Sequence, residues 1–218
     1  LSFCKNADEV DVEKIDGIIA VGRFLSAELE KMKQLGIQVL FVDSNPDPHE
    51  FNSIQPNLQM MVETAIEYFV QAGYQKIGFI GGRSWDSTEG RNVLRDTRTR
   101  CFESRARELG LFNQNYVFIG DNFSVDSGYQ VGREIVGKIR DDLPQAFLVA
   151  SDPLAVGVLQ AFNENKLTVP EDVSMISIND IDIAKYVSPP LTTFRIDTEE
   201  LGKVAIETLR NLIVAPKK

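Results

Sequence analysis

The sequence is poor in the residues from which most catalytic and metal sites are built. Its 218 residues include one histidine, His49, and two cysteines, Cys4 and Cys101. The two cysteines stand apart, so they form neither a disulfide framework nor a metal-binding pair, and they fit a reducing compartment. His49 lies in a loop rich in proline and aspartate, and no Ser/His/Asp or Cys/His arrangement is evident. We therefore expect no catalytic residues, no metal and no cofactor.

Long apolar runs, a basic surplus and a glycine-rich phosphate loop are also missing. No apolar run reaches the roughly 18 residues of a membrane span, and no basic-then-apolar leader precedes the folded pattern, so we expect no membrane partner and a cytoplasmic location. The formal net charge is −9, so the chain lacks the excess of basic residues expected of a surface that binds phosphates. If the protein acts on DNA, another segment must touch it. No P-loop or dinucleotide fingerprint is present.

Short apolar runs alternate with segments of helical periodicity along the whole chain. This alternation is typical of repeated βαβ units and predicts an α/β fold with parallel sheet covered on both faces. The expected strands are Gly17–Val21, Ile37–Val42, Lys76–Ile80, Tyr116–Ile119, Ala146–Ala150 and Val173–Ile178. The expected helices are Leu25–Leu35, Leu58–Phe69, a segment around Cys101–Leu109, Val131–Ile139, Leu154–Phe162 and Leu201–Leu212.

Polar and aromatic residues follow several of these strands. In open α/β sheets the ligand binds beyond the carboxyl ends of the strands, so function is expected there. The candidates are Arg98, Phe123, Ser151, Asp152, Asn179 and Asp180. Together they offer a guanidinium group, side-chain amides or hydroxyls, carboxylates and an aromatic ring. This inventory suits a neutral polyhydroxylated ligand, because sugar hydroxyls need donors and acceptors while sugar C–H faces stack on rings.

Each candidate also has a purely structural interpretation. Ser151 and Asp152 precede Pro153 and fit a helix cap, whereas Asn179 and Asp180 fit a turn. Arg98 fits a solvated helix face and Phe123 a core position. Carboxylates alone could still carry acid/base chemistry, so a carbohydrate-active enzyme stays open as an alternative.

Five segments, in order and at matching separations, resemble the effector-binding core of the lactose/galactose repressor (LacI/GalR) family of bacterial transcription regulators. The galactose-repressor branch is the most similar, through SINDI at Ser177–Ile181. The resemblance covers essentially the whole chain. The five segments are Ile15–Ile19 (IDGII), Ala72–Gly82 (AGYQKIGFIGG), Ala150–Gly157 (ASDPLAVG), Val169–Val173 (VPEDV) and Ser188–Thr193 (SPPLTT).

The resemblance implies two doubly wound parallel-sheet lobes of the periplasmic-binding-protein type, joined by crossovers, with the effector between them. Residues 1–72 and 195–213 would form the N-terminal lobe, without its first strand and helix, and residues 73–194 the C-terminal lobe. Crossovers are expected near Ala72–Tyr74 and Phe194–Arg195, with the Pro-Pro-Leu-Thr-Thr segment as the approach to a hinge. The family's helix-turn-helix headpiece is not in this sequence, so we expect no operator binding by this segment alone.

The resemblance also assigns roles at the expected effector site. Arg98 matches the family's effector-binding arginine and Phe123 its stacking aromatic. Ser151 stands where many members have Asn, Asn179 where many have Asp, and Asn57 where the family often has Asp. These three departures favour a neutral ligand. Asp152 is also expected at the effector site, and Asp180 in a supporting role.

The resulting hypothesis is a homodimeric transcriptional repressor whose core binds a small sugar or sugar derivative and thereby controls operator binding allosterically. The alternative is a periplasmic-type sugar-binding protein for transport or chemotaxis, which shares the two-lobe architecture. A carbohydrate-active enzyme is the third reading.

Overall fold

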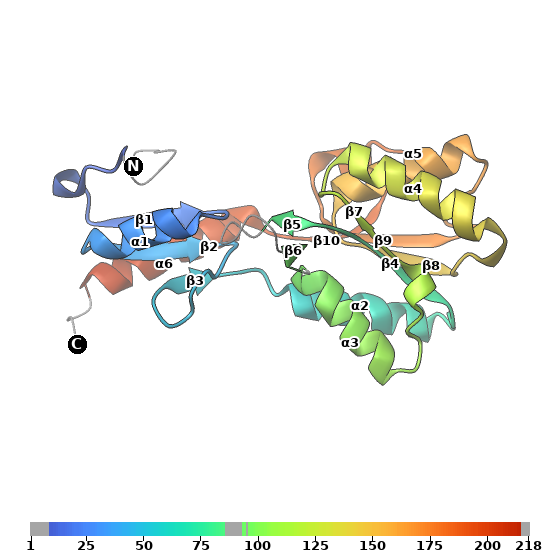
Figure 1. Cartoon of the computed structure of the whole chain (residues 1–218), viewed down its shortest axis with the longest axis horizontal. Helices are drawn as coiled ribbons and strands as arrows, with labels where there is room; N and C mark the ends of the chain where they lie inside the picture. The colour runs from blue at the N-terminus through green and yellow to red at the C-terminus, as the bar shows by residue number, and fades with distance from the viewer. Residues whose placement is uncertain (1–8, 86–92, 95, 215–218) are drawn as a thin grey trace. The chain divides into compact units, whose positions relative to one another are not determined.

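The computed structural model describes residues 9–85, 93–94 and 96–214, and the chain divides into two compact units. Unit 1 comprises residues 1–56, 86–91 and 197–218; unit 2 comprises residues 57–85 and 92–196 (Figure 1). Each unit has a parallel sheet with its own hydrophobic core. The predicted α/β fold with parallel sheets is confirmed.

Unit 1 is built on three parallel strands, β1 (Gly17–Val21), β2 (Gln38–Val42) and β3 (Asn52–Ile54), in the order β1-β2-β3. Side chains alternate along the central strand β2, so consecutive residues pack on opposite faces. Phe41 packs with Met32 of α1 (Ser26–Gln34), and Leu40 packs with Ala205 of α6 (Thr198–Val214). One helix therefore covers each face of this sheet (Figure 1).

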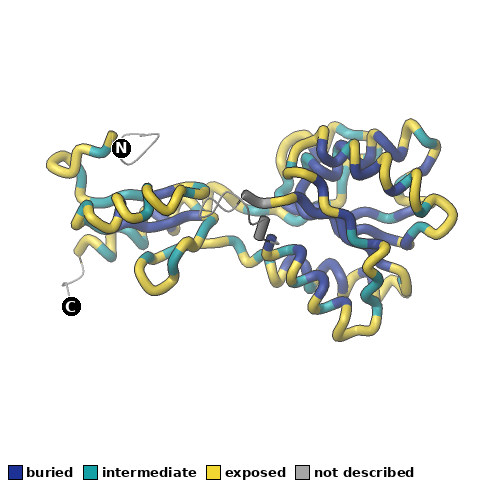
Figure 2. The backbone as a smooth tube through the Cα atoms, in the orientation of Figure 1, coloured by how far each residue is buried: buried dark blue, intermediate teal, exposed yellow. Residues whose placement is uncertain are grey.

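Unit 2 is built on a five-stranded parallel sheet in the order β10-β9-β8-β4-β7. Helices α2 and α3 lie on one face and α4 and α5 on the other (Figure 1). All six residues of β4 are buried, as expected for a central strand covered on both faces (Figure 2). The strands are β4 (Ile77–Gly82), β7 (Val117–Gly120), β8 (Ala146–Val149), β9 (Ser174–Asn179) and β10 (Thr192–Arg195), and the helices are α2 (Leu58–Gln71), α3 (Thr97–Glu108), α4 (Val125–Ile139) and α5 (Asp152–Glu164).

Further short elements connect these layers. A two-stranded antiparallel pair, β5 (Ser84–Trp85) and β6 (Val93–Leu94), follows β4. Single 3-10 turns connect several of the longer elements. They are η2 (Val12–Lys14), η3 (Gln114–Tyr116), η4 (Arg140–Asp142) and η5 (Asp182–Lys185).

Helix α2 confirms the helix expected from apolar spacing, but it packs with unit 2. Its buried face, which includes Val62, Ile66 and Phe69, belongs to the same core cluster as Phe79 of β4. The resemblance had assigned residues up to 72 to the N-terminal lobe, whereas contacts place the boundary at residues 56 and 57. The apolar face of α2 decides this, because it is buried against β4 and its neighbours. The remaining lobe assignments stay predictions.

The Pro-Pro-Leu-Thr-Thr segment leads into a strand that was not expected. Residues Thr192–Arg195 form β10, which pairs in parallel with β9 at the edge of the sheet. Pro189 and Pro190 lack the N–H groups that a ladder requires, so the strand begins after them, and the β-branched threonines suit an extended backbone. Unit 2 ends at Ile196, one residue beyond this strand.

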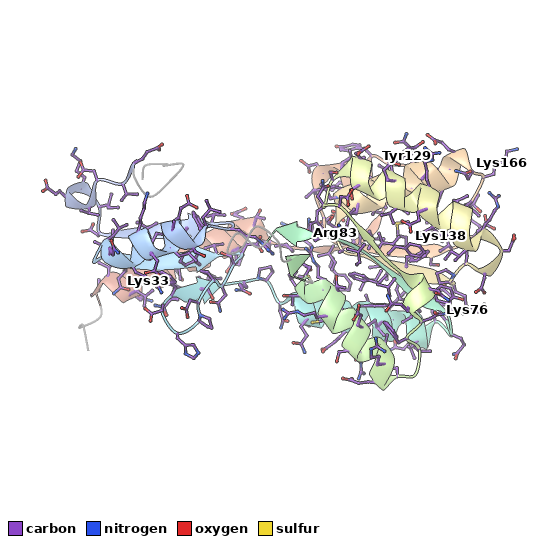
Figure 3. The ribbon with its side chains drawn as sticks, viewed as in Figure 1. Lys33, Lys76, Arg83, Tyr129, Lys138 and Lys166 are labelled. Carbon is purple, nitrogen blue, oxygen red and sulfur yellow. The ribbon has the colours of Figure 1, made fainter. Side chains whose placement is uncertain are left out.

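A polar cluster lies before β4, at the opposite end from Arg83, which follows that strand (Figure 3). The Lys76 Nζ lies 2.5 Å from Asp142 Oδ1, and the Tyr116 hydroxyl donates to Asp142 Oδ2 at 2.8 Å. Hydrogen bonds from Lys76 and then from Tyr116 hold the pKa of Asp142 below its ordinary value. This cluster of buried Tyr116 with exposed Lys76 and Asp142 joins the start of β4 to the turns before β7 and β8, away from the carboxyl edge.

Among the described residues, no helix is long and apolar enough to cross a membrane.

Helices α4 and α5 touch through glycines. A Cβ on Gly128 would lie 2.1 Å from the Leu154 carbonyl oxygen, and one on Gly157 would lie 2.0 Å from the Val125 carbonyl oxygen. These distances leave no room for a side chain, because the obstructing atoms are backbone. The two helices are therefore held at backbone contact over this face of the sheet.

We predict that Gly157→Ala lowers the free energy of unfolding by about 1–3 kcal/mol, since its Cβ forces the two helices apart. Chemical denaturation of the chain measures this change. Gly137→Ala is the matched control, because a Cβ at that position in α4 meets nothing within 4 Å. The control should raise the free energy of unfolding by about 0.5–1 kcal/mol through helix propensity. Equal effects of the two substitutions would contradict the proposed packing constraint.

Candidate functional site at the carboxyl edge of the unit 2 sheet

The sheet order brings the sequence-predicted residues to one edge. Strands β9, β8, β4 and β7 are consecutive neighbours and all parallel, so their carboxyl ends meet on the same side. Asn179 ends β9, Ser151 follows β8, and Phe123 follows β7. The residues that follow these strands can converge only if the strands are neighbours in the sheet, and the observed strand order meets this condition.

Arg98 is held in place by the residue that caps its own helix. Asp96 precedes α3, and its carboxylate accepts the Arg98 backbone N–H at 2.9 Å. The same carboxylate accepts Arg98 Nε at 2.6 Å and Nη2 at 3.1 Å, a fork-to-fork ion pair. Arg98 Nη1 donates to the Ala150 carbonyl oxygen at 2.5 Å. The guanidinium of α3 is thereby fixed over the end of β8.

Phe123 lies under this guanidinium. The Arg98 Cζ is 4.6 Å from the Phe123 ring centroid, within cation–π range. Gly82 at the end of β4 allows this approach, because a Cβ there would lie 2.5 Å from the Asn122 carbonyl oxygen and 3.0 Å from Phe123 Cγ. The loop after β7 therefore packs directly on the end of β4. The aromatic plate and the arginine fork form one preassembled pair.

Ser151 presents a buried hydroxyl beside this pair. It follows Ala150, whose carbonyl binds Arg98, and it is the N-cap of α5, but its side chain makes no capping hydrogen bond. Only 3% of the residue is exposed, and its Oγ has no hydrogen-bond partner. A buried hydroxyl without a partner costs free energy, which a ligand hydroxyl would recover. The predicted capping role of the Ser151 side chain is not observed.

Asp152 binds its own chain at the same edge. It is fully buried, and its Oδ1 accepts the Ser177 hydroxyl at 2.5 Å and the Thr193 hydroxyl at 2.7 Å. Its Oδ2 accepts the Ile181 backbone N–H at 2.8 Å. The carboxylate therefore connects the start of α5 to β9, to β10 and to the turn after β9. A direct ligand contact by Asp152 stays a prediction.

Asn179 and Asp180 form a turn of unusual backbone conformation. Both have positive φ, 125° at Asn179 and 57° at Asp180, which side-chain-bearing residues rarely adopt. The turn is held because the Asp180 N–H donates to Thr193 Oγ1 at 3.3 Å and the next N–H binds Asp152. Strained backbone of this kind persists where surrounding contacts over-determine it, and it concentrates at binding sites.

Asn57 has a local structural role. Its Oδ1 accepts the Met60 backbone N–H at 3.0 Å, so it is the N-cap of α2, and the residue is exposed. This is the capping role that the apolar pattern of the following helix suggests. Its effector contact stays a prediction.

Sequence reasoning missed three residues that organise the edge: Asp96, Ser177 and Thr193. The spacing Asp-x-Arg before a helical pattern could have indicated the first, because a capping carboxylate lies within reach of an arginine two residues on. Nothing in the local sequence indicates the other two, since their partner Asp152 is 25 and 41 residues away.

The arrangement is suited to binding a small molecule. Within residues 9–85, 93–94 and 96–214, no group of three or more His, Cys, Asp or Glu residues could hold a metal ion. The edge offers a fixed guanidinium on a ring, a buried hydroxyl and a strained turn. Such a set can recognise hydroxyl groups and one apolar face of a small molecule.

Comparisons with known proteins agree with this architecture. A model of the family described as periplasmic binding protein-like domain matches residues 66–218. The HTH-type transcriptional regulator GanR of Bacillus subtilis (strain 168) is 42% identical over 197 residues, which are 90% of this chain and 59% of that regulator. The chain thus spans less than two thirds of the length of that relative.

Solved structures share the fold at lower identity. A LacI family transcriptional regulator from Lactobacillus casei with bound sucrose has a TM-score of 0.78 and 20% identity, covering 97% of this chain and 77% of that chain. The lac repressor dimer bound to operator and the anti-inducer ONPF has a TM-score of 0.76 and 24% identity, covering 92% of this chain and 67% of that chain.

We predict that Asp152→Ala lowers the free energy of unfolding by about 1–3 kcal/mol, because it leaves the Ile181 N–H and two hydroxyls without their acceptor. Asp182→Ala is the control, since that carboxylate is 96% exposed and should change the free energy by less than about 0.5 kcal/mol. Urea denaturation followed by circular dichroism measures both. Unchanged stability in Asp152→Ala would contradict the cross-linking role.

Proposed function

Because the chain belongs to the periplasmic binding protein-like domain family, in its LacI/GalR group of regulators, we propose that it binds an uncharged carbohydrate at the carboxyl edge of the unit 2 sheet. The bound carbohydrate is the effector of a transcriptional repressor. The observation that carries this proposal is the Arg98 guanidinium fixed over the Phe123 ring beside the unpartnered Ser151 hydroxyl.

The chemistry of a sugar fits each of these groups. A pyranose has hydroxyls that donate and accept, and C–H faces that pack on aromatic rings. Of the five guanidinium N–H groups of Arg98, three are used by Asp96 and Ala150, so two can donate to ligand hydroxyls. The Asn179 amide lies in the turn at the end of β9 and supplies both a donor and an acceptor.

Sugar binding would act on transcription through a coupling free energy. The ligand favours one conformational state of the protein, and a helix-turn-helix headpiece outside this segment binds the operator with an affinity that depends on that state. The coupling is reciprocal, so operator DNA changes sugar affinity by the same factor. The identity with GanR, an HTH-type regulator, favours this function and a cytoplasmic location over a transport or chemotaxis protein.

The dimer of the hypothesis has a candidate surface in unit 2. Ile183 and Tyr186 are exposed at 43% and 83%, and they stand three residues apart in and just after η5. Residues at this spacing eclipse in a 3-10 helix, so the two side chains lie on one side. A two-fold dimer would present paired DNA-binding headpieces to a pseudo-palindromic operator. The lac repressor structure is of a dimer bound to operator, which supports a dimer for this chain too.

We predict that Arg98→Ala and Asn179→Ala abolish the thermal stabilisation that a matching sugar produces in the wild-type chain. A thermal-shift screen of monosaccharides and disaccharides identifies that sugar. At a hundredfold excess over its dissociation constant the stabilisation should be about 2.7 kcal/mol. Loss of Arg98 removes the two guanidinium N–H groups that would donate to the ligand and the contact of the guanidinium with the Phe123 ring. Loss of Asn179 removes the contact of its amide with the ligand.

Arg100→Ala is the matched control on the same helix. Arg100 is exposed and donates only to Thr97 within α3 among the interactions of the described residues, so its loss should leave sugar stabilisation unchanged. Sugar affinity that survives in both site variants would remove Arg98 and Asn179 from the site. A screen in which no sugar stabilises the wild type would overturn the proposed function.

We predict that Tyr186→Asp shifts the chain from dimer to monomer. Dimerisation would bury the new carboxylate in an apolar interface without a charged partner, which is costly. Sedimentation velocity over a range of protein concentrations measures the change. Tyr68→Asp is the control, since Tyr68 is 60% exposed on α2 and lies outside the proposed surface. A wild-type chain that is monomeric at all concentrations would argue against this surface in the isolated segment.

A further inference from the structure

The charge of Arg98 is neutralised before any ligand arrives. Asp96 contacts it through both carboxylate oxygens, and the side chains of Arg98 and Asp96 are only 12% and 6% exposed. A largely buried ion pair is weakly screened by solvent, so each partner cancels most of the field of the other. The Arg98–Asp96 pair therefore offers hydrogen-bond donors without a net positive charge.

The helix starts at the carboxyl edge carry acids of their own. The N-terminus of a helix attracts anions through its free N–H groups and its dipole. Asp96 caps α3, Asp126 stands in the first turn of α4, and Asp152 stands in the first turn of α5. Each of these three helix starts thus already holds a carboxylate of the chain, and a ligand anion would meet a like charge at each of them.

Arg83, another described arginine near this edge, is also close to an acid. Arg83 follows β4, and its Nη1 lies 3.8 Å from Asp121 Oδ1 after β7 (Figure 3). This pair is exposed and contributes little by itself. Arg83 and Arg98 therefore each face a carboxylate, which weakens the attraction of these two described arginines for a phosphate.

We propose that Asp96 is a specificity-determining residue that restricts the effector site to uncharged sugars and excludes phosphorylated ones. It does so by neutralising Arg98 and occupying the start of α3. The inference rests on the proposed function, because it concerns the same site, and it assigns the class of ligand by charge. Asp96 would act by lowering the affinity for phosphorylated sugars rather than by raising the affinity for uncharged ones.

Asp96 also has a simpler role, as the cap of α3, and the test must separate the two. Asn keeps the capping oxygen and the shape of the side chain but removes the charge. A residue that only caps the helix would leave phosphate binding unchanged when replaced by Asn. A residue that excludes anions would admit phosphate in the same variant, since an unneutralised arginine at a helix start is an anion site.

The experiment titrates inorganic phosphate into the 218-residue chain at constant ionic strength and follows binding by calorimetry and by thermal shift. The wild-type chain should show no saturable binding. Asp96→Asn should show saturable phosphate binding, with an affinity about tenfold or more above the detection limit that the wild type sets, the ratio that one charge-assisted hydrogen bond supplies. Adding Arg98→Gln to Asp96→Asn should remove that gain.

Asp126→Asn is the matched control, because it removes the same charge from the first turn of α4, where Asp126 is exposed. It should not bind phosphate. Asp96→Ser, which also keeps a capping oxygen without the charge, repeats the measurement if Asp96→Asn folds poorly. Saturable phosphate binding by the wild type, an equal gain in Asp126→Asn, no gain in either Asp96 variant, or a gain that survives Arg98→Gln would each overturn the proposal.

Failure of this proposal can be told apart from failure of the proposed function. A wild-type chain that binds both a neutral sugar and phosphate at Arg98 keeps the function and loses the role of Asp96. If the wild-type chain binds no sugar but Asp96→Asn gains phosphate binding, the proposed function fails and the role of Asp96 in excluding anions holds.

Discussion

The buried carboxylate of Asp152 is the constraint on which the carboxyl edge of unit 2 depends. Burying a carboxylate is costly, and here the cost is offset by three hydrogen bonds, from the Ser177 and Thr193 hydroxyls and the Ile181 N–H. These bonds join α5, β9 and the edge strand β10. They also hold the positive-φ turn at Asn179 and Asp180, a conformation that Asn and Asp adopt more readily than other side-chain-bearing residues. The position of the Asn179 amide is therefore set through Asp152.

A second constraint is close backbone contact. Gly82 lets the loop after β7 lie on the end of β4, so Phe123 reaches the guanidinium of Arg98. Gly128 and Gly157 bring α4 and α5 together on one face of the unit 2 sheet. A side chain at either glycine would collide with backbone atoms of the other helix. The candidate site residues lie on elements that touch at these glycines, and such close packing holds their side chains in fixed positions.

The charges of the edge complete this description. Arg98 and Asp96 form an ion pair without net charge, and the same Asp96 carboxylate caps the helix that carries Arg98. The same acidic residues that start the helices shape the field a ligand meets. In the proposed site, the side chains that cap the helices would also act in ligand selection.

The sequence by itself determined the α/β class, the strands and helices with strong apolar patterns, and the edge at which polar residues gather. These are properties of local periodicity and of strand ends, and they can be read without knowing the partners. It did not indicate β3 or β10, whose short strands carry little pattern, nor that α2 packs with unit 2, because that depends on which core receives Phe69 and Ile66.

Only the tertiary structure decided the roles of individual site residues. Ser151 and Asp152 are adjacent in sequence and equally plausible as caps, but the first has a buried unpartnered hydroxyl and the second a fully bonded carboxylate. The difference arises from Thr193 and Ser177, which are far away in the chain and near in the sheet. Hydrogen bonds between such distant residues follow from strand order, and strand order follows from the packing of the whole sheet rather than from any local pattern.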